Sequence, residues 1–179
     1  RDGTLPMTGN LNMGANDIYN AKDITASGKG DFGGNITSMN TREQIHALSE
    51  EMLENLGKLV AVDSQLGTPS EGKPFGEGPA EALEIGLEIA RELGFKTVNL
   101  DNYCGYAEMG EGEEIVGIAG HLDIVPVGGD WTYDPFKLTR DGDHVYGRGT
   151  TDDKGPVIEA LYAMKLLKDS GVKLNKRVR

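Results

Sequence analysis

Two short segments of the sequence contain the side chains whose types and spacing could support chemistry. His121 and Asp123 come directly after the apolar run at residues 115–120, and Asp152 and Asp153 come after a glycine-rich turn. Imidazole and carboxylate groups bind divalent metals or hold one another by hydrogen bonds. The two segments therefore predict a polar site at the rim of a sheet, with a metal ion as its candidate occupant.

The spacing of His121 and Asp123 indicates how the imidazole could be oriented. Residues two apart in an extended chain share a face, so the Asp123 carboxylate could accept a hydrogen bond from one ring nitrogen. Such a bond fixes the tautomer and leaves the other nitrogen available as a metal ligand. Taken alone, the pair favours a simpler interpretation, two surface residues at the end of a strand.

Asp152 and Asp153 lie just before a predicted helix. Pro156 suits a first helical turn, and apolar residues repeat at helical spacing from residue 157 to residue 167. The helix dipole favours carboxylates at this end, and N-capping by Asp153 is the simplest explanation for one of them. Capping does not explain two adjacent acids, and Lys154 is the expected charge partner of either.

The surrounding pattern predicts an α/β fold. Residues 115–120 form a continuous apolar run, which is typical of a strand buried on both faces in a parallel sheet. Apolar stripes predict helices that begin near Thr41 and at Pro79, and strands at residues 95–100 and 106–109. We therefore expect a partial mixed sheet with flanking helices.

Several motifs in a fixed order resemble those of the M20 metallopeptidases, in particular the PepV-like, Xaa-His dipeptidase branch. They are FGEGP at residues 75–79, GHLDIVP at 120–126, WTYDPF at 131–136, and YGRG through DKGP at 146–156. The resemblance covers residues from about 40 to 179. It implies that residues 39–179 are the amino-terminal portion of a zinc-peptidase catalytic domain.

The resemblance also implies roles for individual residues in a two-zinc site. His121 would bind one zinc ion, and Asp123 would be a catalytic residue that orients the imidazole. Asp152 would bridge both metals, and Asp153 would follow it across a cis peptide bond. The substrate would be a small peptide.

The sequence departs from the family where the remaining catalytic groups are expected. A Gly-Thr-x-Glu-Glu segment would supply the general base and a further zinc ligand, but neither it nor the later acidic and histidine ligands are present. His46 and His144 do not substitute for them. We therefore expect a dipeptidase fragment that is inactive alone, and leave open whether this chain is itself an enzyme.

Residues 1–38 have a different character, rich in Asn and Gly with isolated aliphatic residues. The segment NLNMGANDIYNA at residues 10–21 resembles repeats of phage tail fibres and of shufflon-type pilus-tip adhesins. Residues 1–38 would then be a short β-rich segment, and a flexible linker is the alternative. This resemblance implies an alternative function, namely that of a fibre or pilus-tip adhesin, which could be trimeric. The downstream part would then be a natural or engineered fusion.

Composition limits the expected partners. The formal net charge of −11 argues against nucleic acid, since phosphate binding needs a basic face. No apolar run has transmembrane length, so no membrane partner is expected. The single cysteine, Cys104, fits a reducing compartment. We expect a cytoplasmic peptidase part, or an extracellular fibre or pilus tip if residues 1–38 define the protein, and a homo-oligomer formed through those residues or an exposed sheet edge.

Overall fold

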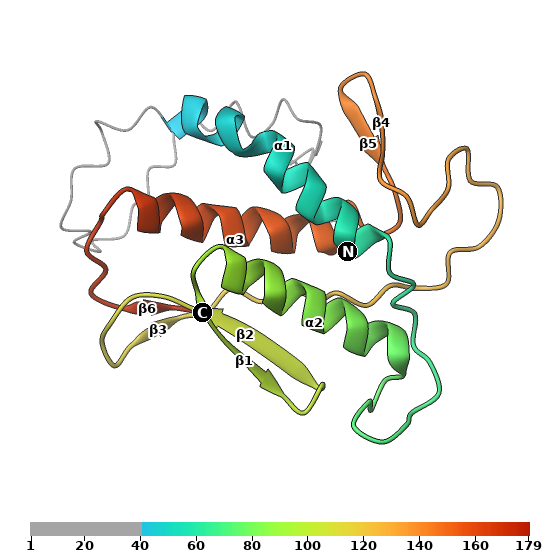
Figure 1. Ribbon diagram of the computed structural model, residues 1–179, viewed down its shortest axis with the longest axis horizontal. Helices are drawn as coiled ribbons and strands as arrows, with labels where there is room; N and C mark the ends of the chain where they lie inside the picture. The colour runs from blue at the N-terminus through green and yellow to red at the C-terminus, as the bar shows by residue number, and fades with distance from the viewer. Residues whose placement is uncertain (1–40) are drawn as a thin grey trace, which may run out of the picture.

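The computed structural model describes residues 41–179, so the predicted fibre-like segment at residues 1–38 lies outside the described part. Within residues 41–179 the chain forms three helices and six strands (Figure 1). The helices are α1 (Thr41–Val60), α2 (Glu77–Glu92) and α3 (Lys154–Asp169). The strands are β1 (Lys96–Leu100), β2 (Cys104–Glu108), β3 (Ile115–Val116), β4 (Thr139–Asp141), β5 (His144–Tyr146) and β6 (Arg177–Val178).

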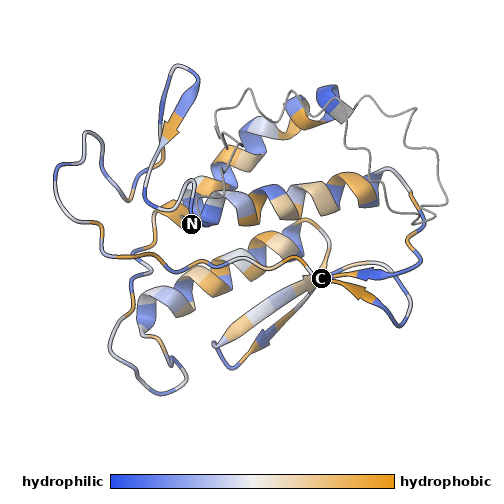
Figure 2. Ribbon diagram, turned by 180° about the vertical axis from the view of Figure 1, so that it is seen from behind, coloured by the Kyte–Doolittle hydropathy of each residue, from blue (hydrophilic) through white to orange (hydrophobic). Residues whose placement is uncertain are grey.

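The hydrophobic core lies between the helices and is built from their apolar stripes. Leu59 and Val60 of α1 are fully buried, and Ile158 and Tyr162 of α3 are almost fully buried. Ile89 of α2 joins the same cluster. Apolar residues recur along all three helices (Figure 2), as the helical period predicts. None of the helices within residues 41–179 is long and apolar enough to cross a membrane.

The strands form three two-stranded sheets beside the helices, and this combination of helices and small sheets confirms the predicted α/β class. β1 pairs with β2 in an antiparallel register, and β3 pairs with β6 in a parallel register. An isolated antiparallel bridge between Met109 and Val178 links these two pairs. The β4–β5 hairpin stands apart from both pairs (Figure 1).

The predicted buried strand at residues 115–120 differs from the observed structure. Only Ile115 and Val116 form a strand, and they are 43% and 48% exposed. Ile118 is 50% exposed as well. A strand is buried when another strand pairs with each of its edges and other elements pack on both of its faces. Among residues 41–179 only β6 pairs with β3. The prediction of a parallel pairing was therefore right and the prediction of burial was wrong.

The start of α2 differs slightly from the one that the sequence predicts, whereas the start of α3 confirms the prediction. α2 begins at Glu77, two residues before Pro79, and α3 begins at Lys154, which places Pro156 in the first helical turn. Gly94 and Gly171 follow the ends of these helices with positive φ angles, as C-terminal glycines usually do. α3 thus starts immediately after the two aspartates of the predicted site.

Candidate metal centre

The segment that follows β3 and the loop that precedes α3 bring His121 and Asp152 together. The His121 Nε2 lies 3.0 Å from the Asp152 Oδ1, although the two residues are 31 positions apart in the sequence. Both side chains face solvent, with 49% of the imidazole and 86% of the carboxylate exposed. The two groups are therefore accessible to a small ligand.

Asp123 fixes the tautomer of His121 through its backbone more than through its carboxylate. The His121 Nδ1 lies 3.2 Å from the Asp123 carbonyl oxygen and 3.4 Å from the Asp123 Oδ1. A carbonyl oxygen can only accept a hydrogen bond, so Nδ1 must carry the proton. The neutral ring then directs its Nε2 lone pair at the Asp152 carboxylate. Either a proton or a metal cation is needed between those two atoms to make the contact favourable.

The surroundings of His121 raise the pKa of its imidazole above the usual value. Partial burial alone lowers this pKa, but the hydrogen bond to the Asp123 carbonyl and the negative charges of Asp123 and Asp152 outweigh that effect. The acidic environment therefore favours a positive charge at the ring. A metal cation at Nε2 would benefit from the same carboxylates.

Asp153 does not cap α3 with its side chain, contrary to the simple interpretation of the sequence. No side-chain capping hydrogen bond is present at this residue. Its Oδ2 instead accepts a hydrogen bond from the His121 backbone N–H, at 3.1 Å. Gly120 makes this approach possible, because a Cβ atom there would lie 2.8 Å from the Asp153 Oδ2. The peptide bond between Asp152 and Asp153 is cis, as the family resemblance implies.

Lys154 does not pair with the aspartates, and the prediction that it does was wrong. The side chain is fully buried, and its Nζ donates hydrogen bonds to the Leu59 and Val62 carbonyl oxygens at 2.8 and 3.0 Å. Burial lowers the pKa of Lys154 to about 8, and the charge of Asp63 offsets part of this shift. The residue belongs to the core between α1 and the start of α3.

Sequence reasoning also missed Ser64. The side chain is fully buried, and its hydroxyl donates a 2.7 Å hydrogen bond to the Leu122 carbonyl oxygen, directly after His121. Nothing in the local sequence marks this serine, since the contact depends on how the end of α1 packs against a distant loop. His46 on α1 and His144 in β5 are exposed.

The number of nearby donors is smaller than a complete metal site requires. Within residues 41–179 no group of three or more His, Cys, Asp and Glu side chains is arranged to hold a metal ion. Structural and catalytic zinc sites use three or four protein ligands. The geometry therefore provides a pair of suitable donors, one imidazole and one carboxylate.

The candidate site opens onto a large apolar groove. The groove has a volume of about 1000 Å³ and reaches from His121, Asp123 and Asp153 along α2 and α3. Its walls are mostly aliphatic, with Leu83, Leu87, Val157, Leu161 and Met164 among the lining residues. The lining is thus mostly apolar, and its polar members include Asn102 and Arg179 as well as the residues of the candidate site.

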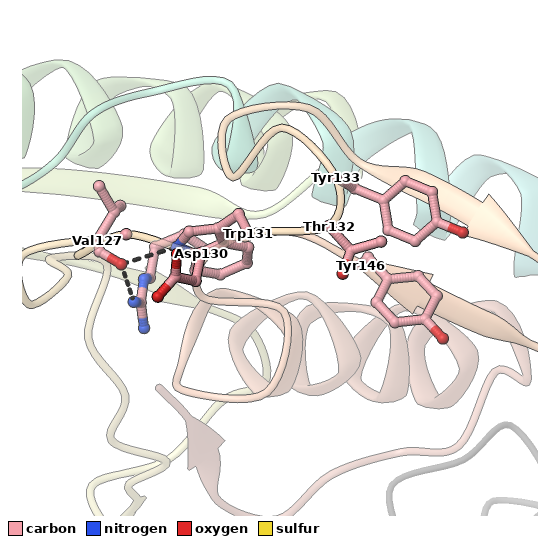
Figure 3. A pocket seen from close by; sticks show the side chains of 8 residues that line it. Val127, Asp130, Trp131, Thr132, Tyr133 and Tyr146 are labelled. Atoms are coloured by element: carbon pink, nitrogen blue, oxygen red, sulfur yellow. Dashed lines mark hydrogen bonds between the residues drawn. The ribbon is translucent and has the colours of Figure 1, made fainter.

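The aromatic loop after His121 forms a separate, smaller pocket of about 380 Å³ (Figure 3). The Arg148 guanidinium lies over the Trp131 ring at 4.9 Å, and both side chains donate hydrogen bonds to the Val127 carbonyl oxygen. The rings of Tyr133 and Tyr146 lie 4.8 Å apart on the other side of this pocket. These side-chain contacts define the conformation of the aromatic loop.

Comparisons with known proteins agree on one family. Residues 117–179 match the profile of Peptidase family M20/M25/M40. The Beta-Ala-Xaa dipeptidase of Lactobacillus delbrueckii subsp. lactis is 42% identical over 143 residues, which are 78% of this chain and 30% of that protein. The chain thus spans about 30% of the length of this curated relative.

Solved structures give the same result. Human carnosine dipeptidase 1 has a TM-score of 0.62 at 24% identity, over 76% of this chain and 32% of that chain, and supports the fold alone. The M20 family metallo-carboxypeptidase Sso-CP2 from Sulfolobus solfataricus has a TM-score of 0.56 at 29% identity, over 72% of this chain and 29% of that chain. The part of the chain that the structure describes therefore belongs to peptidase family M20/M25/M40.

Proposed function

We propose that this chain supplies part of the metal centre of a zinc-dependent dipeptidase. His121 and Asp152 are the metal ligands, Asp123 orients the imidazole, and Asp153 holds the His121 backbone. The observation that carries the proposal is the 3.0 Å approach of the His121 Nε2 to the Asp152 Oδ1. Asp152 also stands next to Asp153, so both acids act on the same histidine.

The donors fit zinc in kind. Imidazole nitrogen and carboxylate oxygen are ordinary zinc ligands, and the Asp123 carbonyl holds the proton on Nδ1 so that Nε2 is the ligating atom. They do not fit zinc in number, since two donors leave the coordination incomplete. The remaining ligands and the general base would come from outside the described residues. A metal ion in such a centre lowers the pKa of a bound water and polarises the scissile carbonyl.

The relatives support a proposal about the substrate class. The curated relative at 42% identity is a Beta-Ala-Xaa dipeptidase, and we propose a dipeptide as the substrate of the longer protein to which these residues correspond. The groove beside His121 offers mostly apolar walls to such a molecule. The free, exposed Cys104 is consistent with a reducing compartment, and we propose the cytoplasm for the peptidase part.

Zinc binding by the full chain tests the proposed ligands. We expect Zn²⁺ to bind weakly and to raise the thermal unfolding midpoint, because two donors from distant segments are held together only in the folded state. His121→Ala and Asp152→Asn each remove one donor and should abolish both effects. Titration with a competing chromogenic chelator and a thermal melt measure the two quantities.

His144→Ala is the matched control, because it removes an exposed imidazole in β5 outside the site. We expect this variant to bind Zn²⁺ like the unchanged chain. Equal zinc affinity in the His121→Ala variant and the unchanged chain would contradict the proposal. So would a loss of binding in the His144→Ala variant alone.

A further inference from the structure

The Lys154 side chain ties the loop that contains Asp152 to the end of α1. Its buried Nζ donates hydrogen bonds to the carbonyl oxygens of Leu59 and Val62, at 2.8 and 3.0 Å. Lys154 directly follows Asp153 in the chain and is the first residue of α3. The placement of both aspartates therefore depends on the backbone at the end of α1.

The Ser64 side chain ties the segment that contains His121 to the same part of the chain. The Ser64 hydroxyl donates a 2.7 Å hydrogen bond to the Leu122 carbonyl oxygen. The Ser64 carbonyl oxygen accepts a 3.2 Å hydrogen bond from the Ile124 N–H. These bonds hold the backbone immediately after His121 and on either side of Asp123.

Both halves of the candidate metal centre thus rest on residues 59–64, which we call the α1 platform. We propose that the α1 platform sets the distance between His121 and Asp152, with Ser64 and Lys154 as its positioning residues. The inference rests on the proposed function in one respect, namely that His121 and Asp152 share a metal ion. Neither positioning residue touches that ion or a substrate.

The exposure of the two ligands explains why such a platform is needed. The Asp152 side chain is 86% exposed and the His121 side chain is half exposed, so packing restricts neither of them completely. Their separation is then determined by the backbones from which they extend. A metal site loses affinity when its donors must be brought into position at the time of binding. Buried hydrogen bonds to backbone carbonyls reduce that cost because they hold both segments in advance.

A core role without positioning is the competing explanation, and Tyr162→Phe separates the two. Tyr162 lies in the same α1–α3 core, accepts a buried hydrogen bond from Asn55 and donates a partly buried one to Glu51, both on α1. The Tyr162→Phe variant should therefore destabilise the same helix pair. Within residues 41–179 the side-chain hydrogen bonds of Asn55 and Glu51 go to Tyr162 and not to the segments that contain His121 and Asp152.

The experiment measures zinc affinity, thermal stability and amide hydrogen exchange in the full chain. We expect Ser64→Ala to weaken Zn²⁺ affinity by about tenfold, comparable with the loss of a hydrogen bond that supports a metal ligand. Amide exchange at His121 should become faster in the same variant without metal. Tyr162→Phe should lower the thermal midpoint without changing zinc affinity or exchange at His121. Lys154→Met should weaken zinc affinity and speed exchange at His121, as Ser64→Ala does. If Lys154→Met does not fold, the Ser64→Ala variant alone tests the inference.

Unchanged exchange at His121 in the Ser64→Ala variant would overturn the inference. So would a Tyr162→Phe variant that loses zinc affinity and speeds exchange at His121 as much as Ser64→Ala does. If the unchanged chain binds no Zn²⁺, the proposed function fails, and the metal-free exchange data still decide whether the α1 platform positions His121. The two failures are therefore distinguishable.

Discussion

The buried Lys154 gives the protein a specific dependence on pH. Its pKa is about 8 in the folded chain, against an ordinary value of 10.5 that the unfolded chain recovers. Below pH 8 both states hold the proton, and the folded state bears the full cost of burying a charge. Between pH 8 and 10.5 only the unfolded state holds it, so the free energy of unfolding rises with pH. A neutral amine still has two N–H donors for the two carbonyl oxygens of the α1 platform.

We expect the unfolding free energy of the unchanged chain to rise by up to about 3 kcal/mol across this window, relative to Lys154→Met. Urea titrations of both proteins at pH 7.5 and pH 10.5 measure the unfolding free energies. Subtracting the values of Lys154→Met removes the contribution of the other titrating groups. Lys137→Met is the control, because this lysine is exposed. A parallel pH profile for the unchanged chain and Lys154→Met would show that the buried amine does not titrate in this range.

At the level of single residues, the sequence identified the groups that meet at the site but not the groups that hold them. His121, Asp123, Asp152 and Asp153 stand out by type and spacing, and the structure places them together. Their roles in metal binding stay a prediction. Lys154 was assigned the wrong partner, because the sequence showed two neighbouring acids and could not show the carbonyl oxygens of a distant helix end.

At the level of elements, helix α1 packs on α3 through apolar residues and one buried polar network. The Tyr162 hydroxyl accepts a hydrogen bond from the Asn55 Nδ2 and donates one to the Glu51 Oε1, both at 2.8 Å. Burial raises the pKa of Tyr162 well above its usual value, and the hydrogen bond to Glu51 adds to the shift. The hydroxyl is therefore a neutral donor at any ordinary pH.

Tyr162→Phe should lower the free energy of unfolding by about 1 to 3 kcal/mol. The ring still fills its space, but Asn55 loses its acceptor in a buried setting, and an unsatisfied buried polar group costs this much. Urea denaturation at neutral pH measures the change. Tyr103→Phe is the matched control, since Tyr103 is 66% exposed, and it should change stability by less than about 0.5 kcal/mol. Equal effects of the two substitutions would contradict the role of the buried network.

The helices could be predicted from the sequence, whereas the strand at residues 115–120 could not be placed correctly. Helical stripes extend over four or more turns, so their period identifies the element and its buried face. A six-residue apolar run has no such internal signal. Its burial depends on neighbouring strands, and within residues 41–179 only β6 lies beside it. Ile115 and Val116 are exposed because no strand within residues 41–179 pairs with the other edge of β3.

At the level of the whole molecule, the described residues leave an apolar surface uncovered. The groove of about 1000 Å³ beneath α2 and α3 continues to the exposed aliphatic residues around β3. Figure 2 shows β3 as an apolar strand next to the polar β6. Contiguous apolar surface of this kind commonly marks a place where another protein surface packs.

The open edge of β3 should make the chain as printed associate with further copies of itself. Only one side of β3 is paired within residues 41–179, and an exposed apolar edge offers unpaired backbone groups to another strand. Sedimentation velocity over a tenfold range of concentration should show concentration-dependent association. Val116→Lys places a charge on the edge strand and should shift the distribution toward monomer.

Val125→Lys is the matched control for this edge, because it introduces the same charge at a valine that is 67% exposed and lies outside β3. Association should persist in that variant, since the strand edge is unchanged. A single sharp monomer for the unchanged chain at every concentration would exclude pairing through β3. Equal dissociation by both lysine substitutions would show that the effect is not specific to the β3 edge and would contradict pairing through it.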